Sequence, residues 1–256
     1  MLKGLVSLVT GGASGLGKAT VERLVRNGGK VVLMDIQATR ANEFMKTLGN
    51  DVVLSPGNIK SEEDVQKCLD LIKEKFGRLD CVVNCAGLAV AHQTYNFYNK
   101  KEHKLEDFAE IINVNTIGTF NVIRLSAGLI AENSPNSDGQ KGVIVNTAST
   151  TAYEGDIGQV AYAASNAGII GMTLPIARDL APLGIRVVTI APGLFDTPLI
   201  SYLPEKIKQY LIRMTPFPSR FGKPEEFAHL VTSIIENPML NGEVIRLDGA
   251  NRTFPL

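Results

Sequence analysis

The sequence predicts an α/β fold with a single doubly wound parallel sheet of about seven strands and helices on both faces. Three observations support this fold class. Short β-branched apolar runs alternate with helical patterns, the first run leads directly into a glycine-rich loop, and the second run ends in an acidic residue. The strands are expected at residues 5–9, 30–35, 52–54, 79–84, 143–145, 185–191 and 243–247.

The first strand, loop and helix together predict a dinucleotide site. Thr10 to Gly17 joins the first strand to a helix expected over 18–27. This order places backbone N–H groups and the positive end of a helix dipole where a pyrophosphate can bind. Gly11, Gly15 and Gly17 permit the tight turn and the close approach, although a glycine loop can also merely turn the chain.

Asp35 ends the second strand, 18 residues after Gly17, where a ribose-binding carboxylate is expected. No cation follows directly at Ile36 or Gln37 to bind a 2′-phosphate, so the pattern favours NAD over NADP. A strand-end acid that caps the next helix is the alternative interpretation of Asp35. Arg40 lies near enough to weaken the preference for NAD.

Small and polar residues end the next two strands. Asn58-Ile59 follows the third strand, where an adenine could rest, and a helix is expected over 61–76 with Ser61 as its N-cap. Asn84-Cys85-Ala86-Gly87 ends the fourth strand beside the expected cofactor crevice.

The polar segment 91–104 interrupts the alternation and is expected to be an inserted surface loop. Its lysines could meet a phosphorylated ligand such as coenzyme A, but a charge run is usually only solvated. A long helix is expected over 105–133, in which Asn115 either bends the helix or bonds its surroundings and could hold a water near the site. Segment 194–220, with four prolines beyond a strand end and a short helix expected over 205–213, suits a substrate lid or an ordinary connection. A last helix, opened by a proline, is expected over 224–236.

We place the chemistry between Ser149 and Asn166. Ser149 closes the fifth strand, and Tyr162 lies on an alanine-rich helix. Asn166, four residues later, shares the helix face of Tyr162. A strand-end hydroxyl beside a phenol is a plausible acid–base pair acting on an alcohol or a carbonyl. The alternative is that Ser149 caps a turn and Tyr162 packs in the core.

The composition favours one catalytic domain over residues 1–256. Lysine plus arginine and aspartate plus glutamate both total 26, so no net charge attracts nucleic acid or an anionic membrane. The chain enters a strand directly after Met1-Leu2-Lys3, which leaves no space for a cleaved leader, and no apolar run approaches the roughly 20 residues of a membrane span. These features predict a soluble intracellular protein. The three cysteines form no Cys-x-x-Cys pair and are expected to be reduced, and the three histidines show no metal-ligand spacing, so no metal is assigned.

The ordered set of motifs resembles the short-chain dehydrogenase/reductase family over essentially the whole chain. Its members share the glycine loop, the Asn-x-Ala-Gly strand end, a helix Asn, the Ser and Tyr pair and a Pro-Gly after the sixth strand. The resemblance implies a Rossmann-type fold in which Ser149 orients the substrate oxygen and Tyr162 exchanges its proton, with Asn115 and Asn166 completing the site. It implies an NAD site formed by Gly11, Ser14, Gly15, Leu16, Gly17, Asp35, Asn58, Ile59, Cys85, Ala86, Gly87, Pro192, Gly193, Phe195 and Thr197.

The resemblance is greatest to a mitochondrial branch of that family. It implies reversible NAD-linked oxidation of 3-hydroxyacyl-CoA to 3-ketoacyl-CoA, with hydroxysteroids as further substrates. It also implies a homotetramer that serves as a subunit of a tRNA-processing complex, so that any link to nucleic acid is indirect.

Two positions depart from the family pattern. Asn166 stands where the family has a lysine, and a neutral side chain cannot stabilise a tyrosinate by charge. Asn58 stands where the family usually has an aspartate, which bears on cofactor affinity. Two functions therefore compete: a dehydrogenase impaired by Asn166, and an NAD-binding scaffold subunit with little turnover.

Overall fold

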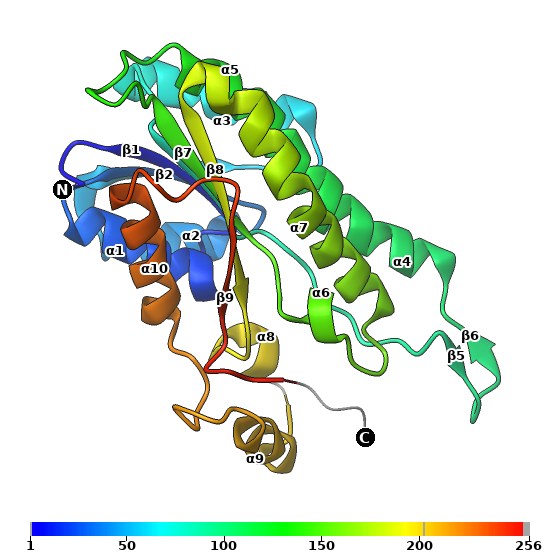
Figure 1. The fold of residues 1–256 in the computed structure, drawn as a ribbon. Coiled ribbons are helices and arrows are strands. Elements are labelled where there is room, and N and C mark those ends of the chain that lie inside the picture. Colours follow the sequence, from blue (N-terminus) through cyan, green and yellow to red (C-terminus); the bar gives the residue numbers. More distant parts are fainter. Residues whose placement is uncertain (1, 202, 253–256) are drawn as a thin grey trace.

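The computed structural model describes residues 2–201 and 203–252 (Figure 1). A seven-stranded sheet runs through it in the order β3-β2-β1-β4-β7-β8-β9, and every neighbouring pair is parallel. The predicted parallel sheet is confirmed. Its strands are β1 (Val6–Thr10), β2 (Lys30–Asp35), β3 (Val52–Pro56), β4 (Cys81–Asn84), β7 (Gly142–Thr147), β8 (Ile185–Pro192) and β9 (Val244–Leu247).

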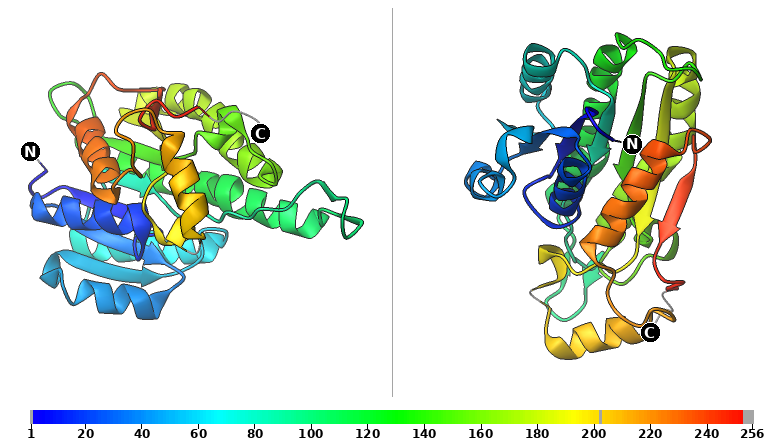
Figure 2. Two further views of the ribbon diagram at one scale, coloured as in Figure 1. Left: turned by 90° about the horizontal axis from the view of Figure 1, so that it is seen from below. Right: turned by 90° about the vertical axis from the view of Figure 1, so that its left-hand side faces the viewer.

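Helices cover both faces of this sheet (Figures 1 and 2). One face carries α1 (Gly15–Arg26), α2 (Ala38–Met45) and α10 (Pro224–Glu236), and the other carries α3 (Glu62–Phe76), α5 (Thr119–Ala131) and α7 (Val160–Leu180). Alternate strand residues feed the two cores, as Val9 joins the first and Leu8 the second. Burying one such side chain stabilises the fold by about 1.5–3 kcal/mol.

Local signals explain where several helices begin and end. The Ser61 hydroxyl accepts a hydrogen bond from Asp64 N, as its predicted N-cap role requires, and Gly77 closes α3 in the left-handed conformation at φ 70°. The predicted helix over 224–236 matches α10, with Pro224 in its first turn. Residues 38–45, 151–154 and 198–201 also form helices, which the sequence analysis did not predict.

The expected long helix over 105–133 is present from Leu105 to Ala131, but it is not regular α-helix throughout. It consists of α4 (Leu105–Ile112), a π-helical turn at Asn113–Gly118, and α5. Asn115 lies inside the π-helical turn, and its amide bonds the backbone of Leu88 and the hydroxyl of Ser165. Of the two alternatives for Asn115, the structure shows that its side chain bonds its surroundings, from within a π-helical turn.

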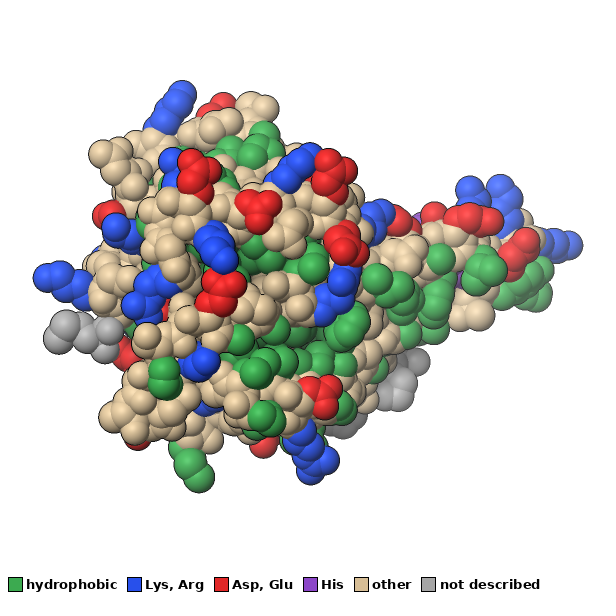
Figure 3. All heavy atoms as spheres, turned by 90° about the horizontal axis from the view of Figure 1, so that it is seen from above, with side chains coloured by type: hydrophobic (Ala, Val, Ile, Leu, Met, Phe, Trp, Pro, Cys, Tyr) green, Lys and Arg blue, Asp and Glu red, His purple; other side chains and the backbone are tan. Residues whose placement is uncertain are grey.

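The segment 91–104 is a projecting antiparallel hairpin rather than a plain loop. It contains β5 (Tyr95–Asn96) and β6 (Lys101–Glu102), in which Tyr95 pairs with Glu102. Phe97 and Tyr98 at its tip are 79% and 95% exposed. Figure 3 shows this arm extending from the body with lysine and hydrophobic side chains at its end.

One helical stretch passes a length and composition test for a membrane span. Residues 160–183, which include α7, contain a window of mean hydropathy 1.3. This stretch is longer than any apolar run that the sequence analysis expected. In the fold, α7 packs beside β8 and buries the apolar side chains Ile169, Ile176 and Ala177, while Val160 and Leu174 stay exposed.

The three cysteines are free thiols in or beside the core. Burial raises the pKa of Cys81 and of Cys85 to about 12, and that of Cys68 to about 11. The thiolate is the reactive form, so these side chains are inert at neutral pH.

We therefore expect the native protein to resist Ellman's reagent at pH 8. With a pKa near 11, only about one Cys68 in a thousand is ionised there. The same protein in denaturant should release three reactive thiols, which provides the control. Rapid stoichiometric labelling of the native chain would contradict the burial of these groups.

Candidate active site

The glycine loop after β1 leaves no volume for side chains. A Cβ on Gly11, whose φ is 65°, would lie 2.7 Å from Ala86 N, and a Cβ on Gly17 would overlap the Gly11 carbonyl oxygen. A Cβ added to Gly15, whose φ is 50°, would lie 3.4 Å from the Thr197 side chain, so the segment after β8 contacts the loop. The backbone is thus held in the close-approach geometry that a pyrophosphate site needs.

The start of α1 differs from that of α3 in a way that suits an anion. Ser14, the N-cap of α1, makes no side-chain capping bond, and no acidic residue lies in the first turn of α1. The first turn of α3 is capped by Ser61 and carries three acidic residues. Because the N–H groups and dipole of α1 are not compensated in this way, a phosphate is the chemically complementary ligand there.

Asp35 lies at the end of β2 with its carboxylate held in place. One oxygen accepts from Ala13 N at 3.0 Å, and the other accepts from Gln37 N at 2.9 Å. The loop is therefore tied to the acid predicted to bind the ribose. Asn58 lies in a turn after β3, where its side chain accepts from Lys60 N and its N–H donates to Asp64.

Three buried side chains form a row of hydrogen bonds across the carboxyl ends of β1, β4 and β7. Thr10 Oγ1 lies 3.4 Å from Asn84 Oδ1, and Asn84 Nδ2 donates to Asn146 Oδ1 at 2.9 Å. Ala86 N donates to Thr10 Oγ1, which places the predicted Cys85-Ala86-Gly87 segment over the glycine loop. The row fixes where the loops that carry the site leave the sheet.

Ser149 lies two residues beyond β7, with 8% of its surface exposed. Its Oγ accepts from Thr151 N at 3.2 Å, at the start of the single turn α6 (Thr151–Glu154). This is the turn-capping contact of the alternative interpretation. It leaves the hydroxyl hydrogen free to donate elsewhere, so the cap does not exclude a chemical role.

Tyr162 lies in the first turn of α7, and its side chain is partly buried. Burial raises its pKa above the ordinary value, while hydrogen bonds with the Ser149 hydroxyl and the Asn166 amide lower it by less. Ser149 and Tyr162 are thus brought together, as predicted. In the described part of the chain, no cationic side chain contributes to lowering this pKa.

Asn166 is 3% exposed, and its Nδ2 donates to the Tyr162 carbonyl oxygen at 2.8 Å. The amide is therefore satisfied by its own helix, one turn back. Asn115 is likewise engaged: its Oδ1 accepts from Leu88 N at 2.8 Å, and its Nδ2 donates to Leu88 O and Ser165 Oγ. Its side chain orders the site, and the water-holding role expected for it stays a prediction.

The end of β8 closes the other side of the site. Thr150 N donates to Pro192 O at 3.0 Å, and Gly193 N donates to Leu247 O at 2.9 Å. Phe195 is 6% exposed and bridges to Gly222. The predicted cofactor residues after β8 therefore adjoin the Ser149 segment.

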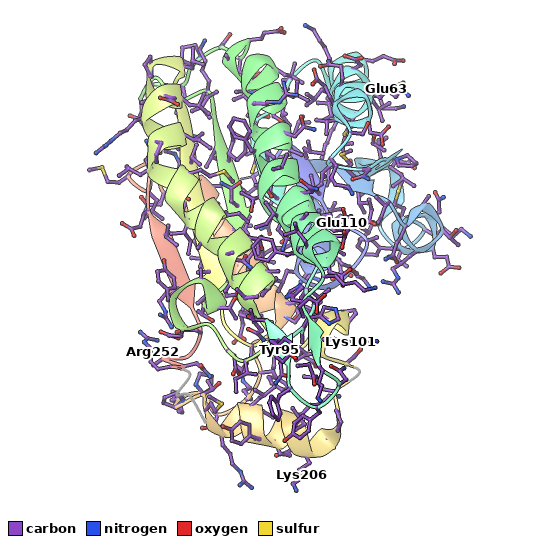
Figure 4. All side chains as sticks on the ribbon, turned by 90° about the vertical axis from the view of Figure 1, so that its right-hand side faces the viewer. Glu63, Tyr95, Lys101, Glu110, Lys206 and Arg252 are labelled. Atoms are coloured by element: carbon purple, nitrogen blue, oxygen red, sulfur yellow. The ribbon has the colours of Figure 1, made fainter. Side chains whose placement is uncertain are left out.

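A cleft of about 380 Å³ opens between the hairpin and the loop before α7, and Val160 and Ala163 of the first turn of α7 line its wall. The sequence analysis missed Gln159 in its wall, whose Oε1 is buried without a hydrogen-bond partner. No motif identifies that residue; only its position three residues before Tyr162 could have drawn attention. Figure 4 shows Tyr95 and Lys101 of the hairpin at the same end of the molecule as Lys206 of α9 (Glu205–Arg213).

Comparison with known proteins agrees with this geometry. A family model described as short chain dehydrogenase matches residues 5–208. The chain is 60% identical over 255 residues to 3-hydroxyacyl-CoA dehydrogenase type-2 of Drosophila melanogaster, covering 100% of both chains. A crystal structure of 3-hydroxyacyl-CoA dehydrogenase type-2 from Mycobacterium avium aligns with a TM-score of 0.94 at 40% identity, covering 99% of this chain and 98% of that one. One of 3-ketoacyl-(acyl-carrier-protein) reductase from Brucella melitensis, complexed with NADH, aligns at 0.86 and 27% identity, covering 98% and 99%.

Replacing Gly17 by alanine tests the close packing of the loop. The added methyl overlaps the Gly11 carbonyl, so we expect a loss of about 1–3 kcal/mol in the free energy of unfolding and at least tenfold weaker NADH binding. The matched control is Gly128→Ala on α5, where a Cβ meets open space and should stabilise the helix by roughly 0.5–1 kcal/mol. Denaturant titration and NADH fluorescence measure both, and unchanged NADH affinity in Gly17→Ala would contradict the assignment.

Proposed function

The chain belongs to the short-chain dehydrogenase family, and on that basis we propose that it interconverts 3-hydroxyacyl-CoA and 3-ketoacyl-CoA with NAD(H). It is an oxidoreductase by family. The observation that carries the proposed reaction is the partly buried Tyr162 phenol beside the Ser149 hydroxyl, at the strand ends where the glycine loop and Asp35 also lie. The name of the 60% identical relative supports the substrate class.

The residues divide the work by their chemistry. NAD(H), when bound, accepts or gives the hydride. The first turn of α1 and the Asp35 carboxylate would hold it, and a carboxylate there disfavours a 2′-phosphate. Ser149 Oγ donates to the substrate oxygen and so orients it. Tyr162 Oη gives its proton to that oxygen in ketone reduction and takes it back in alcohol oxidation.

The charge state of Tyr162 limits the rate. A raised phenol pKa leaves little phenolate to act as the base in oxidation, and it makes Tyr162 a weaker acid for protonating the substrate oxygen in reduction. Because the Asn166 amide is neutral and bonded to its own helix, it supplies no compensating charge. Both directions pass through the same transition state, so both should be slow.

Further parts of the proposal concern additional substrates, cellular location and assembly. Hydroxysteroids as further substrates and a mitochondrial location follow only from the resemblance. A homotetramer is supported by the exposed apolar side chains Ile117, Phe120 and Leu174, which lie on the neighbouring elements from the π-helical turn to α7. The alternative of an NAD-binding scaffold in a tRNA-processing complex finds no support in the relatives, whose names are those of a dehydrogenase and a reductase.

Asn166→Lys should raise the rate of acetoacetyl-CoA reduction by NADH about 10²-fold or more. The ammonium would lower the free energy of the tyrosinate through its charge. The matched control is Asn166→Met, which has similar length and no charge and should leave the rate low. Equal activation by both variants would assign the gain to size, and no turnover in any of the three proteins with NADH bound would overturn the substrate assignment.

The pH profile of alcohol oxidation tests the Tyr162 assignment separately. Because its pKa is raised, the phenolate fraction and kcat/KM should increase about tenfold per pH unit from pH 7 to 9. In Asn166→Lys the profile should level off at lower pH. A flat profile in the unmodified chain would show that Tyr162 is not the base.

A further inference from the structure

A cluster of charged side chains at the end of β9 lies outside the proposed cofactor and substrate residues. Arg246, on β9, donates to both oxygens of Glu154 at 2.6 and 3.0 Å. The same guanidinium contacts Asp248 at 2.7 Å and the Asn251 carbonyl oxygen at 3.0 Å. The side chains of Arg246, Glu154 and Asp248 are only 22%, 19% and 7% exposed. A bidentate, partly buried pair fixes direction as well as distance, unlike an ordinary surface ion pair.

Glu154 is the last residue of α6, the turn that carries Ser149 at its other end. Within this turn, Glu154 N donates to Thr150 O at 3.2 Å, and Ala152 N donates to Ser149 O at 3.1 Å. Thr151 N donates to Ser149 Oγ itself. A helix of four residues has little stability of its own, so its position depends on what holds its ends.

Both ends of α6 are tied to neighbouring strands. At its start, Thr150 N donates to Pro192 O of β8, and at its end Glu154 meets Arg246 of β9. In the sheet, Arg246 is in register with Ala191, one residue before Pro192. A Cβ on Gly193 would lie 2.8 Å from Asp248 Cβ, so the acid on the other side of Arg246 abuts the predicted cofactor segment.

We propose that Arg246 is a positioning residue for the reaction. Its two hydrogen bonds to Glu154 fix α6, and α6 in turn fixes Ser149 Oγ relative to Tyr162 and the end of β8. This inference rests on the proposed function for its kinetic consequence. Arg252 also reaches Glu154, at 3.4 Å, and Asp248, at 3.1 Å, but from a half-exposed position. Figure 4 shows it at the same end of the molecule as the hairpin.

The test compares Arg246→Met, Arg246→Lys and Glu154→Gln, each made in the full chain and in the Asn166→Lys background. For Arg246→Met and Glu154→Gln we expect kcat to fall at least tenfold, while the KM for NADH and the NADH Kd change less than about threefold. Arg246→Lys keeps the positive charge but loses the two parallel hydrogen bonds of the guanidinium, so its kcat should be intermediate. Hydrogen exchange of the 149–155 amides should be faster in the variants with the larger fall in kcat. This measurement can be made without turnover.

The matched control is Arg78→Met. Arg78 makes a comparable two-point pair with Asp80, at 2.6 and 3.0 Å, but next to the amino end of β4 and therefore away from the site. This variant should leave kcat and exchange in 149–155 unchanged, even if it lowers the melting temperature as much as Arg246→Met does.

Unchanged exchange and unchanged kcat in Arg246→Met would overturn the proposal. So would parallel loss of NADH binding, melting temperature and kcat, which would assign Arg246 a general structural role. If the parent chain and Asn166→Lys show no turnover at all, the proposed reaction fails, and the exchange measurement decides the positioning role by itself.

Discussion

The row of buried hydrogen bonds from Thr10 through Asn84 to Asn146 is the constraint on which the site depends. Parallel pairing sets these three residues side by side at the carboxyl edge of the sheet. Leaving a buried amide or hydroxyl without its partner costs about 1–3 kcal/mol, so the row strongly opposes any slip in strand register. The glycine loop, Gly87 and the Ser149 segment all leave the sheet just beyond this row, and their relative positions follow from it.

The same burial creates the chemical difficulty of the site. An edge that excludes water enough to hold a substrate oxygen also disfavours the charged form of Tyr162. The hydroxyl of Ser149 and the amide of Asn166 offset this only in part, because they are dipoles and each pKa unit corresponds to about 1.4 kcal/mol. A full positive charge is the simplest way to offset the rest, and position 166 is where the family places one.

Sequence patterns predicted the parts of the structure whose causes are local. The seven strands and the helices Glu205–Arg213 and Pro224–Glu236 follow from periodicity, caps and prolines, and the structure has them within a few residues. The π-helical turn was missed, and the partners of its Asn115 are distant in sequence: Leu88 is 27 residues away and Ser165 is 50 residues away. The pair of Arg246 and Glu154 joins residues 92 apart, so no motif could have indicated it. For the site, family motifs predicted that Ser149 and Tyr162 lie close together. They did not predict that the Asn166 amide bonds the Tyr162 carbonyl oxygen, nor that Gln159 lines the cleft.

This division explains how the chemistry at position 166 can change while the fold does not. The proposed cofactor half of the site is largely backbone, and its geometry is enforced by Gly11 and Gly17, where a side chain would clash. The proposed substrate half is a set of side chains from different elements, of which Ser149 and Asn166 hydrogen-bond to their own neighbouring backbone. Asn166 satisfies its Nδ2 on the Tyr162 carbonyl, so the buried amide costs the helix little. An asparagine there in place of a lysine removes a charge from the reaction without leaving its amide nitrogen unbonded, so the cost falls on the rate and not on the helix.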